Sequence, residues 1–190
     1  MFRRGFKTWC ENISAQFRRR LGLNPWDPVD SWSIAKSLSM MVLTPKQITG
    51  LDRKSLSVLT EEDPNSWSAC TITLNGRDLV ILNSSHSKAR QSSDLAHELS
   101  HKILDHKPAN TSFSNDGLLL LSFYDKNQEE EAGWLAGCIL LPRDSILHIR
   151  KRSIPLQSAA TSYGVSPKML KYRLQVTGVD YQTGHKKRRK

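Results

Sequence analysis

Apolar residues recur at helical spacing in several stretches of this 190-residue chain. The strongest pattern runs through residues 2–21, 94–104 and 128–140, and glycine or proline follows each segment within a few residues. These three segments are predicted to be helices. Shorter segments with the same spacing predict further helices at residues 30–38, 143–152, 155–163 and 166–176.

A second pattern, short runs of β-branched and other apolar residues, predicts strands. Residues 70–74 and 78–83 flank an Asn-Gly dipeptide, which favours the tight turn of a β-hairpin. Further short strands are expected at residues 40–43 and 118–124. Helices and strands together predict an α+β fold.

Composition limits where the protein acts. Its longest apolar runs, residues 118–121 and 134–141, are too short to span a bilayer, so no membrane contact is expected. The basic N-terminus continues into polar residues rather than the apolar core of a secretory signal. Three widely spaced cysteines without a CxxC pair favour neither disulfides nor a thiolate zinc site. We therefore expect a cytoplasmic protein.

The net charge of +10 is unevenly distributed. Residues 1–20 carry +5 and residues 143–190 carry +10, whereas the segment between them carries −5. Basic ends of this kind steer proteins toward anionic partners such as DNA, although solvated tails are the commoner explanation. A weak DNA contact through the basic termini is therefore one expectation.

The sequence HELSH at residues 97–101 lies in the predicted helix 94–104. At about 100° per residue, the polar side chains of this helix share one arc, and the apolar ones occupy the opposite side, which therefore enters the core. The shared arc holds Asp94, His97, Glu98, His101 and Asp105.

Two histidines one helical turn apart can bind one Zn²⁺ through their ring nitrogens. His97 and His101 have this spacing, and Glu98 projects beside the metal, where it can act as general base for a water molecule. The alternative is a solvated helix face with incidental histidines. A catalytic zinc also needs a third protein ligand. The choice between these two interpretations therefore depends on whether another part of the chain can supply it.

Three candidates exist for the third ligand. Asp105 lies about 12 Å from His97 along the helix, which is too far for both to bind one ion. His106 is a candidate only if the helix has already ended. The three glutamates at 129–131 lie at the start of the next strongly predicted helix. Acidic residues are favoured at that position by the helix dipole alone, without any role in metal binding. A ridge of small residues would let this helix pack closely on another: Ala132, Gly133, Ala136 and Gly137.

Two motifs in order, HELSHKILDH at 97–106 and EEEAGWLAGCILLP at 129–142, resemble the ImmA/IrrE family of zinc metallopeptidases. Further segments between about residues 3 and 177 are similar to family segments. The implied fold is zincin-like, with a small antiparallel sheet packed on the HExxH helix and a short, helix-turn-helix-like C-terminal appendage. The implied division is a peptidase domain at 1–142, the helical appendage at 143–178 and a basic disordered tail at 179–190.

The resemblance also implies a site. One zinc ion per chain is held by His97, His101 and Glu129, with Glu98 as the catalytic acid/base. Glu129 is chosen because it precedes an alanine by three positions, as the family glutamate does. Gly133 departs from the Asn or Asp usual in the family, and such a polar residue could orient a ligand histidine.

Two acids on the HExxH helix are candidates to replace the contact missing at position 133. Asp94 and Asp105 both lie on the same arc as the histidines. Candidates for the group that stabilises the oxyanion during hydrolysis are Tyr124, Tyr163 and His148.

Family members of this kind cleave a helix-turn-helix transcriptional repressor and so relieve repression in mobile elements or stress responses. The resemblance therefore implies a gluzincin-like metalloendopeptidase, with HExxH plus a glutamate, whose protein substrate is such a repressor.

A competing interpretation comes from the C-terminal segment. Residues 160–170 have the spacing of a helix-turn-helix, with Gly164 at the turn. Lys168, Lys171 and Arg173 on the second helix could contact nucleic acid. The alternative function is therefore a DNA-binding transcriptional regulator whose metallopeptidase domain is inactive.

Overall fold

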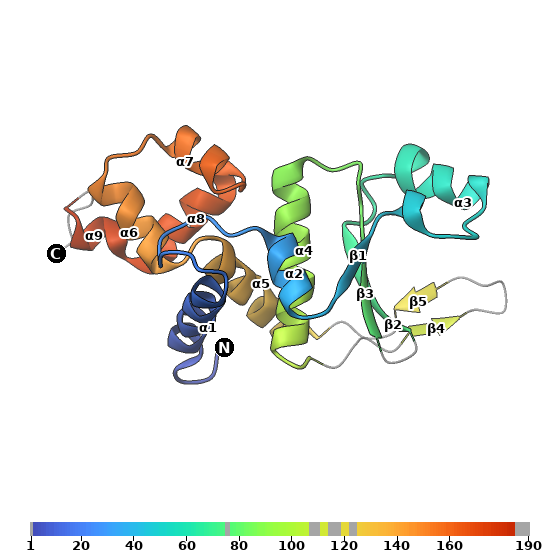
Figure 1. Cartoon of the computed structure of the whole chain (residues 1–190), viewed down its shortest axis with the longest axis horizontal. Coiled ribbons are helices and arrows are strands. Elements are labelled where there is room, and N and C mark those ends of the chain that lie inside the picture. Colours follow the sequence, from blue (N-terminus) through green and yellow to red (C-terminus); the bar gives the residue numbers. More distant parts are fainter. Residues whose placement is uncertain (1, 75–76, 107–110, 114–118, 122–124, 185–190) are drawn as a thin grey trace.

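The computed structural model describes residues 2–74, 77–106, 111–113, 119–121 and 125–184. Within these residues the chain forms an α+β fold, with helices around a small mixed sheet and a separate pair of short strands (Figure 1). None of the described helices is long and apolar enough to cross a membrane. The elements are α1 (Phe6–Arg20), α2 (Ser31–Ser37), β1 (Met41–Leu43), η1 (Pro45–Gln47), α3 (Arg53–Ser57), η2 (Val58–Glu62), β2 (Ala69–Leu74), β3 (Arg77–Leu82), α4 (Lys88–Ile103), β4 (Thr111–Phe113), β5 (Leu119–Leu121), α5 (Lys126–Leu140), α6 (Arg143–Lys151), α7 (Leu156–Ser162), α8 (Pro167–Thr177) and α9 (Val179–Gln182).

The three-stranded sheet has the order β1-β3-β2. β2 and β3 pair antiparallel, as the predicted hairpin, with Thr71 opposite Val80. β1 runs parallel to β3, so the prediction of a purely antiparallel sheet is wrong. Residues 44–76 separate these two strands, and a connection of that length can return the chain for a parallel pairing.

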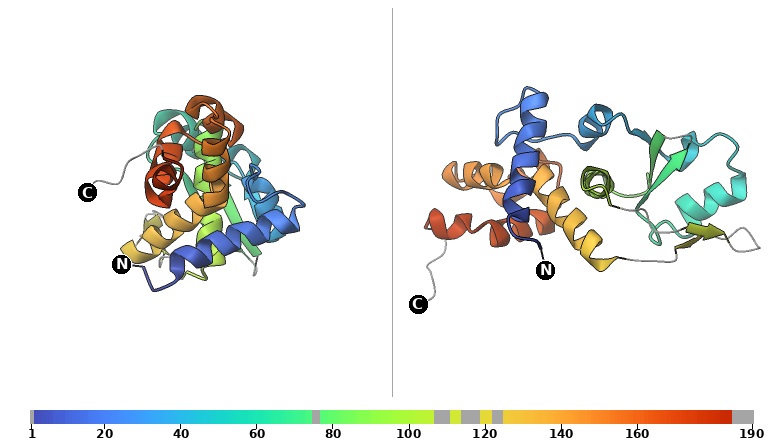
Figure 2. Two further views of the ribbon diagram at one scale, coloured as in Figure 1. Left: turned by 90° about the vertical axis from the view of Figure 1, so that its left-hand side faces the viewer. Right: turned by 90° about the horizontal axis from the view of Figure 1, so that it is seen from below.

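Helix α4 lies between the sheet and the helices α1 and α5 (Figure 2). It contacts β2 and β3 on one side and α5 on another. Leu95, Ala96 and Leu99 are fully buried, which confirms the predicted apolar side. His97 and His101 remain partly exposed. The helix thus presents a polar stripe beside β2 and α5 while its apolar side anchors it in the core.

Helix α4 begins earlier than the sequence indicates. The predicted helix starts at residue 94, but Ser87 is the N-cap, and its side chain accepts a hydrogen bond from the backbone N–H of Arg90. The first two turns are mostly polar, so no apolar periodicity marks them. This longer helix carries the histidines in its second half.

Two apolar clusters meet at α4 and α5. The first joins α1, α2, the sheet, α4 and α5, and includes Leu99, Val80 and Leu135. The second joins α4 and α5 to α6–α9, and includes Ala96 and Ala136. Three of the four small residues of the predicted ridge, Ala132, Ala136 and Gly137, are therefore buried, whereas Gly133 is half-buried.

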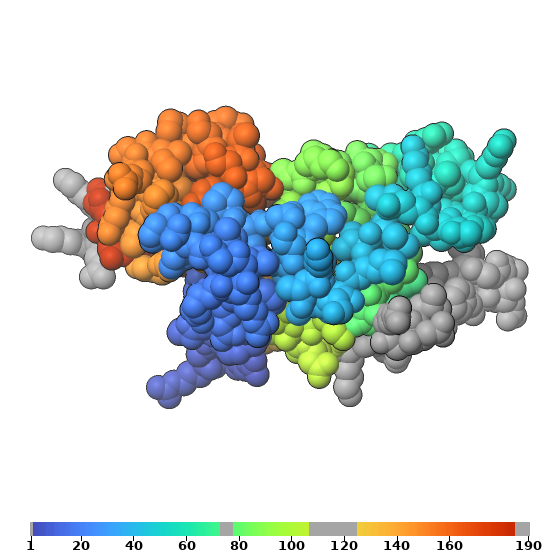
Figure 3. Space-filling view, in the orientation of Figure 1, coloured from blue at the N-terminus to red at the C-terminus, as the bar shows by residue number. Residues whose placement is uncertain are grey.

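The C-terminal helices pack against the rest of the chain, and the space-filling view shows the N-terminal residues lying against them (Figure 3). Gly164 has φ 60° at the turn between α7 and α8, and Ser166 caps α8. The division at residue 142 stays a prediction. The predicted tail does not start at 179, because Val179 is buried in α9, whereas residues 185–190 lie outside the described part.

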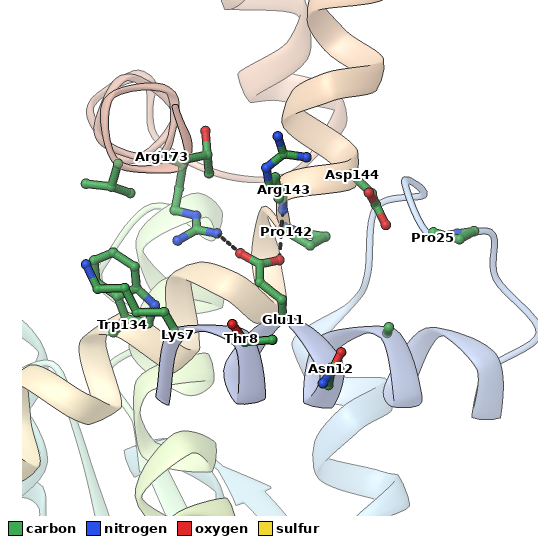
Figure 4. A pocket seen from close by; sticks show the side chains of 13 residues that line it. Lys7, Thr8, Glu11, Asn12, Pro25, Trp134, Pro142, Arg143, Asp144 and Arg173 are labelled. Atoms are coloured by element: carbon green, nitrogen blue, oxygen red, sulfur yellow. Dashed lines mark hydrogen bonds and ion pairs between the residues drawn. The ribbon is translucent and has the colours of Figure 1, made fainter. Parts of the chain in front are cut away.

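Buried charged groups join the N-terminal helix to the C-terminal helices. The fully buried Arg173 of α8 donates from Nη2 to Glu11 Oε1 at 2.7 Å and from Nε to the carbonyl of Leu141 at 2.8 Å (Figure 4). The other oxygen of Glu11 accepts the backbone N–H of Arg143 at 2.9 Å, at the start of α6. One glutamate of α1 therefore holds two C-terminal helices.

A second buried arginine, Arg18, lies on α1, the helix that carries Glu11. Arg18 donates from Nη1 to Ser14 Oγ at 2.6 Å and to the carbonyl of Ile139 at 3.0 Å. Burial lowers the pKa of Arg18 to about 10, which still leaves it charged at neutral pH. We call Glu11, Ser14, Arg18 and Arg173 the α1 cluster.

Candidate metal centre

The polar stripe of α4 meets the first turns of α5. His97 Nε2 lies 3.0 Å from Glu129 Oε2, and His101 Nε2 lies 3.3 Å from Glu129 Oε1. The two imidazole Nε2 atoms are 3.1 Å apart. We call these three residues the α4 cluster, and their side chains are partly exposed, at 30%, 23% and 33% respectively for His97, His101 and Glu129.

The spacing of these atoms fits a tetrahedral metal ion. Ligand atoms bound at about 2.0–2.1 Å to a tetrahedral zinc lie about 3.4 Å from one another. The two imidazole Nε2 atoms are 3.1 Å apart, and each lies 3.0 or 3.3 Å from a different oxygen of the Glu129 carboxylate. One ligand atom from each of the three residues lies within 4.8 Å of the other two. Two imidazoles and one carboxylate are a zinc donor set that leaves the fourth position open, as catalytic zinc sites do. Residues of the α4 cluster therefore have both the chemistry and the geometry to hold zinc.

The electrostatics of His101 favour a neutral ring. Burial lowers its pKa to about 4, and the neighbouring His97 acts in the same direction, against the opposing effect of Glu129. A neutral imidazole keeps a lone pair on one nitrogen, which a metal ion requires.

Glu98 lies next to the cluster and faces β2. Its Oε2 accepts a hydrogen bond of 2.5 Å from Thr71 Oγ1 on that strand. Burial raises the pKa of Glu98, although the bond from Thr71 opposes this shift. A carboxylate with a raised pKa is a better proton acceptor near neutral pH. Among the described residues, this hydrogen bond occupies Oε2 and leaves Oε1 for another partner.

Asp94 makes contacts other than the ones considered from the sequence. Its Oδ2 lies 3.3 Å from Nδ1 of the buried His86 and 3.7 Å from Nε of Arg90. The contacts found for Asp94 join α4 to the loop after β3 and do not include His97 or His101. Asp94 is thus placed to fix the start of the helix rather than to orient a ligand.

Asp105 lies just beyond the end of α4 in the left-handed region, with φ 53°. The backbone N–H of Asp105 donates to the carbonyl of Lys102 at 3.2 Å, and that of His106 donates to the carbonyl of His101 at 3.0 Å. These two bonds are the Schellman arrangement that ends many helices, with an aspartate where glycine is commonest. The turn carries His106 back against the helix.

His106 contacts His101 at Nδ1, the ring nitrogen on the opposite side from the α4 cluster. Its Nδ1 lies 3.0 Å from Nδ1 of His101, and its Nε2 lies 3.3 Å from Glu131 Oε2. His106 is therefore not placed as a third ligand, because it meets the ring nitrogen of His101 that faces away from the α4 cluster. Sequence reasoning missed this contact, since it depends on the left-handed turn at Asp105.

The residues considered for other roles lie in the C-terminal half or outside the described residues. Tyr163 donates its hydroxyl to the carbonyl of Trp26 at 2.6 Å, and His148 stacks on the Trp26 ring. Tyr124 lies outside the described residues. Neither Tyr163 nor His148 is thus placed by its contacts at the α4 cluster.

The lysines and the arginine of α8 differ in exposure. Lys168 and Lys171 are exposed. Arg173 is fully buried and paired with Glu11, so the prediction that it contacts nucleic acid does not agree with its position. Arg173 lies on the same helix as the two lysines, but on the side that faces the interior.

Comparison with known proteins adds one match. The family model described as Peptidase_M78, IrrE N-terminal-like domain, matches residues 51–175, which is more than half of the chain and includes α4 and α5. Neither the curated proteins nor the solved structures contain a significant match.

Proposed function

The chain belongs to the IrrE N-terminal-like family of metallopeptidases, and from that premise we propose that it is a zinc-dependent endopeptidase. The observation that carries the proposal is the convergence of His97, His101 and Glu129, which place one ligand atom each within 4.8 Å of one another. Glu98 is proposed as the catalytic acid/base.

Zinc bound at this site would polarise the carbonyl of the scissile peptide and make a water molecule acidic enough to react near neutral pH. Glu98 then takes one proton from the attacking water and delivers it to the nitrogen of the departing amine as the C–N bond breaks. The hydrogen bond from Thr71 to Oε2 supports Oε1 as the oxygen that carries this proton.

We further propose that the substrate is a helix-turn-helix transcriptional repressor, whose cleavage relieves repression. The resemblance of the two motifs to the ImmA/IrrE family supports this substrate. A repressor gene next to the gene for this chain would identify the protein to test.

Metal analysis and cleavage assays test the proposal together. Purified protein is expected to contain close to one zinc ion per chain, and His97→Ala is expected to lose it. Glu98→Gln is expected to keep zinc but to abolish cleavage of the repressor, because the amide cannot accept the proton. Glu130→Gln is the matched control, since Glu130 is an exposed glutamate on α5 beside the ligand Glu129. Wild-type protein without zinc, or cleavage that survives in Glu98→Gln, contradicts the proposal.

A second candidate function rests on the exposed side of α8. Lys168, Lys171 and Gln175 are exposed along one side of a helix that follows a glycine turn and a serine cap. A DNA-binding regulator would show salt-sensitive binding to duplex DNA that survives in Glu98→Gln. Such binding should fall when Lys168 and Lys171 are changed to glutamate, and its absence in the wild-type chain excludes this function.

A further inference from the structure

The backbone holds His106 in one place. The Schellman turn at Asp105 brings the His106 N–H onto the carbonyl of His101 at 3.0 Å, so the two residues are tied through the main chain. The His106 side chain is only 7% exposed, and that of Glu131 is 25% exposed. A nearly buried imidazole at the end of a helix needs partners for both of its nitrogens.

Both nitrogens of His106 have a partner. Nδ1 faces His101 Nδ1 at 3.0 Å, and Nε2 faces Glu131 Oε2 at 3.3 Å. The two rings meet edge to face, with centroids 5.0 Å apart. A chain of contacts therefore runs from the carboxylate of Glu131 through His106 to His101, and ends at the Nε2 atom that belongs to the α4 cluster.

The positions of the protons along this chain follow from simple rules. A carboxylate only accepts hydrogen bonds, so Nε2 of His106 carries its proton and donates to Glu131. A neutral imidazole has one N–H, so Nδ1 of His106 is then an acceptor. Nδ1 of His101 must donate to it, which leaves Nε2 of His101 without a proton.

We propose that His106 and Glu131 are positioning residues, which fix the proton of His101 on Nδ1 and so keep its Nε2 free to bind the metal. The inference rests on the proposed zinc site. It concerns the support of one ligand, however, and it can fail while the zinc site stands. Glu131 determines which ring nitrogen of His106 carries the proton, and His106 in turn determines which ring nitrogen of His101 carries it.

This assignment supplies the support for which the sequence offered no clear residue. Position 133 has no side chain, because it is a glycine. Asp94 is occupied with His86 and Arg90, and Asp105 holds the left-handed turn. A histidine and a glutamate therefore take over the role of orienting a ligand, as carboxylate-histidine pairs do behind many zinc ions.

The zinc affinity of the full chain tests the role of His106. The dissociation constant is measured by competition with a chromophoric chelator. His106→Leu removes the acceptor and is expected to weaken zinc binding about 10–100-fold, while saturating zinc still gives one ion per chain. His106→Asn places an amide oxygen near the former position of Nδ1, so its affinity is expected to stay near that of the wild type. If Asn weakens binding as much as Leu, the proposed hydrogen bond is wrong.

A second pair of variants tests Glu131 without removing a ring from the structure. Glu131→Gln replaces a charged acceptor by a neutral one and is expected to weaken zinc binding by less than His106→Leu. Glu130→Gln changes an exposed glutamate of the same turn and is expected to leave the affinity unchanged. Equal affinities for these two variants would overturn the role of Glu131, even if His106→Leu fails to fold.

The proton of His101 can be observed directly. In the full chain freed of zinc with a chelator, two-bond proton–nitrogen NMR spectra are expected to show His101 protonated on Nδ1, and His106→Leu is expected to lose this preference. A wild-type chain with the proton on Nε2 overturns the inference. Wild-type protein that binds no zinc would instead contradict the proposed function, so the two failures are distinguishable.

Discussion

Two clusters of polar and charged residues lie at α5, and they differ in what they contain. The α1 cluster has its own cations, since Arg18 and Arg173 donate to Ser14, Glu11 and main-chain carbonyls. The α4 cluster brings two imidazole nitrogens and a carboxylate within 3.0–3.3 Å of one another, without an arginine or lysine among its three members. The first group supplies its own cations, although Nη2 of Arg18 is buried without a hydrogen-bond partner among the described residues, whereas the second has the composition of a site that accepts a cation.

This difference assigns the α1 cluster to the stability of the fold and the α4 cluster to metal binding. A buried arginine that lines up with carbonyls and a carboxylate fixes helices in place, because removal of the arginine would leave several acceptors unpaired. A cluster of two imidazoles and a carboxylate gains its stabilisation when a metal binds. Variants in the two clusters should therefore change different measurements.

The largest effect on stability is expected at Arg173. Arg173→Met leaves Glu11 and the carbonyl of Leu141 without their partner, and is expected to lower the free energy of unfolding by about 3 kcal/mol. Glu11 keeps some contact with water, which places the estimate at the lower end of the usual range. Urea unfolding measures the loss, and the zinc content of the folded variant should be unchanged.

Lys171→Met is the control for Arg173→Met. Lys171 lies on the same helix α8 but is exposed, so its loss should change stability little. If the two variants lose the same stability, the contacts of Arg173 with α1 and α5 contribute nothing measurable. The α1 cluster would then not be a stabilising cluster, in contrast to what is expected here.

The next largest effect is expected from zinc itself. A ligand at 100 times its dissociation constant stabilises the native state by about 2.7 kcal/mol. Wild-type protein should show this gain on addition of zinc, and His97→Ala should not. Unfolding curves recorded with zinc and with a chelator measure the difference. A gain that persists in His97→Ala would place the bound zinc somewhere other than the α4 cluster.

Patterns local in the sequence allow most of the helices and the hairpin to be predicted. Apolar periodicity locates α1 and α5, and the Asn-Gly dipeptide between two β-rich runs locates the β2–β3 hairpin. The parallel pairing of β1 could not be predicted, because it depends on how the chain returns after residues 44–76. The segment that forms α3 and η2 carries no buried residue and so shows no pattern of its own.

The same distinction applies to the candidate site. The spacing of His97 and His101 places both rings on one side of a helix, so local sequence is enough. The partnership of His106 with His101 depends on a left-handed turn at Asp105, a conformation that an aspartate rarely signals. The choice of Glu129 over its neighbours came from a family resemblance. The sequence alone does not distinguish three adjacent glutamates as ligands, because the packing of α5 on α4 determines which of them reaches the histidines.

A smaller effect is expected at Asp105 itself. Asp105→Gly relieves the left-handed backbone and should keep both stability and zinc affinity, whereas Asp105→Val should cost about 1–2 kcal/mol. Urea unfolding and chelator competition measure the two quantities. Weaker zinc binding by Asp105→Gly would show that the carboxylate, and not the turn, supports the α4 cluster.

The smallest effects are expected at two glycines of α5, one near each cluster. A methyl group at Gly133 meets nothing within 4 Å, so Gly133→Ala should stabilise the helix by roughly 0.5–1 kcal/mol. The same group at Gly137 lies 3.2 Å from Cδ of Arg173, whose guanidinium is held at both Nε and Nη2. Gly137→Ala should therefore lose the helical gain or destabilise the chain.

The double variant Gly137→Ala with Arg173→Met identifies the cause of that loss. If the held arginine is the obstacle, the alanine should recover its helical gain once the more flexible methionine replaces the arginine. Unfolding in urea with a chelator present keeps zinc out of the comparison. An alanine at 137 that stabilises the wild-type chain as much as one at 133 would mean that Arg173 moves freely, and the α1 cluster would then not be the rigid counterpart of the α4 cluster.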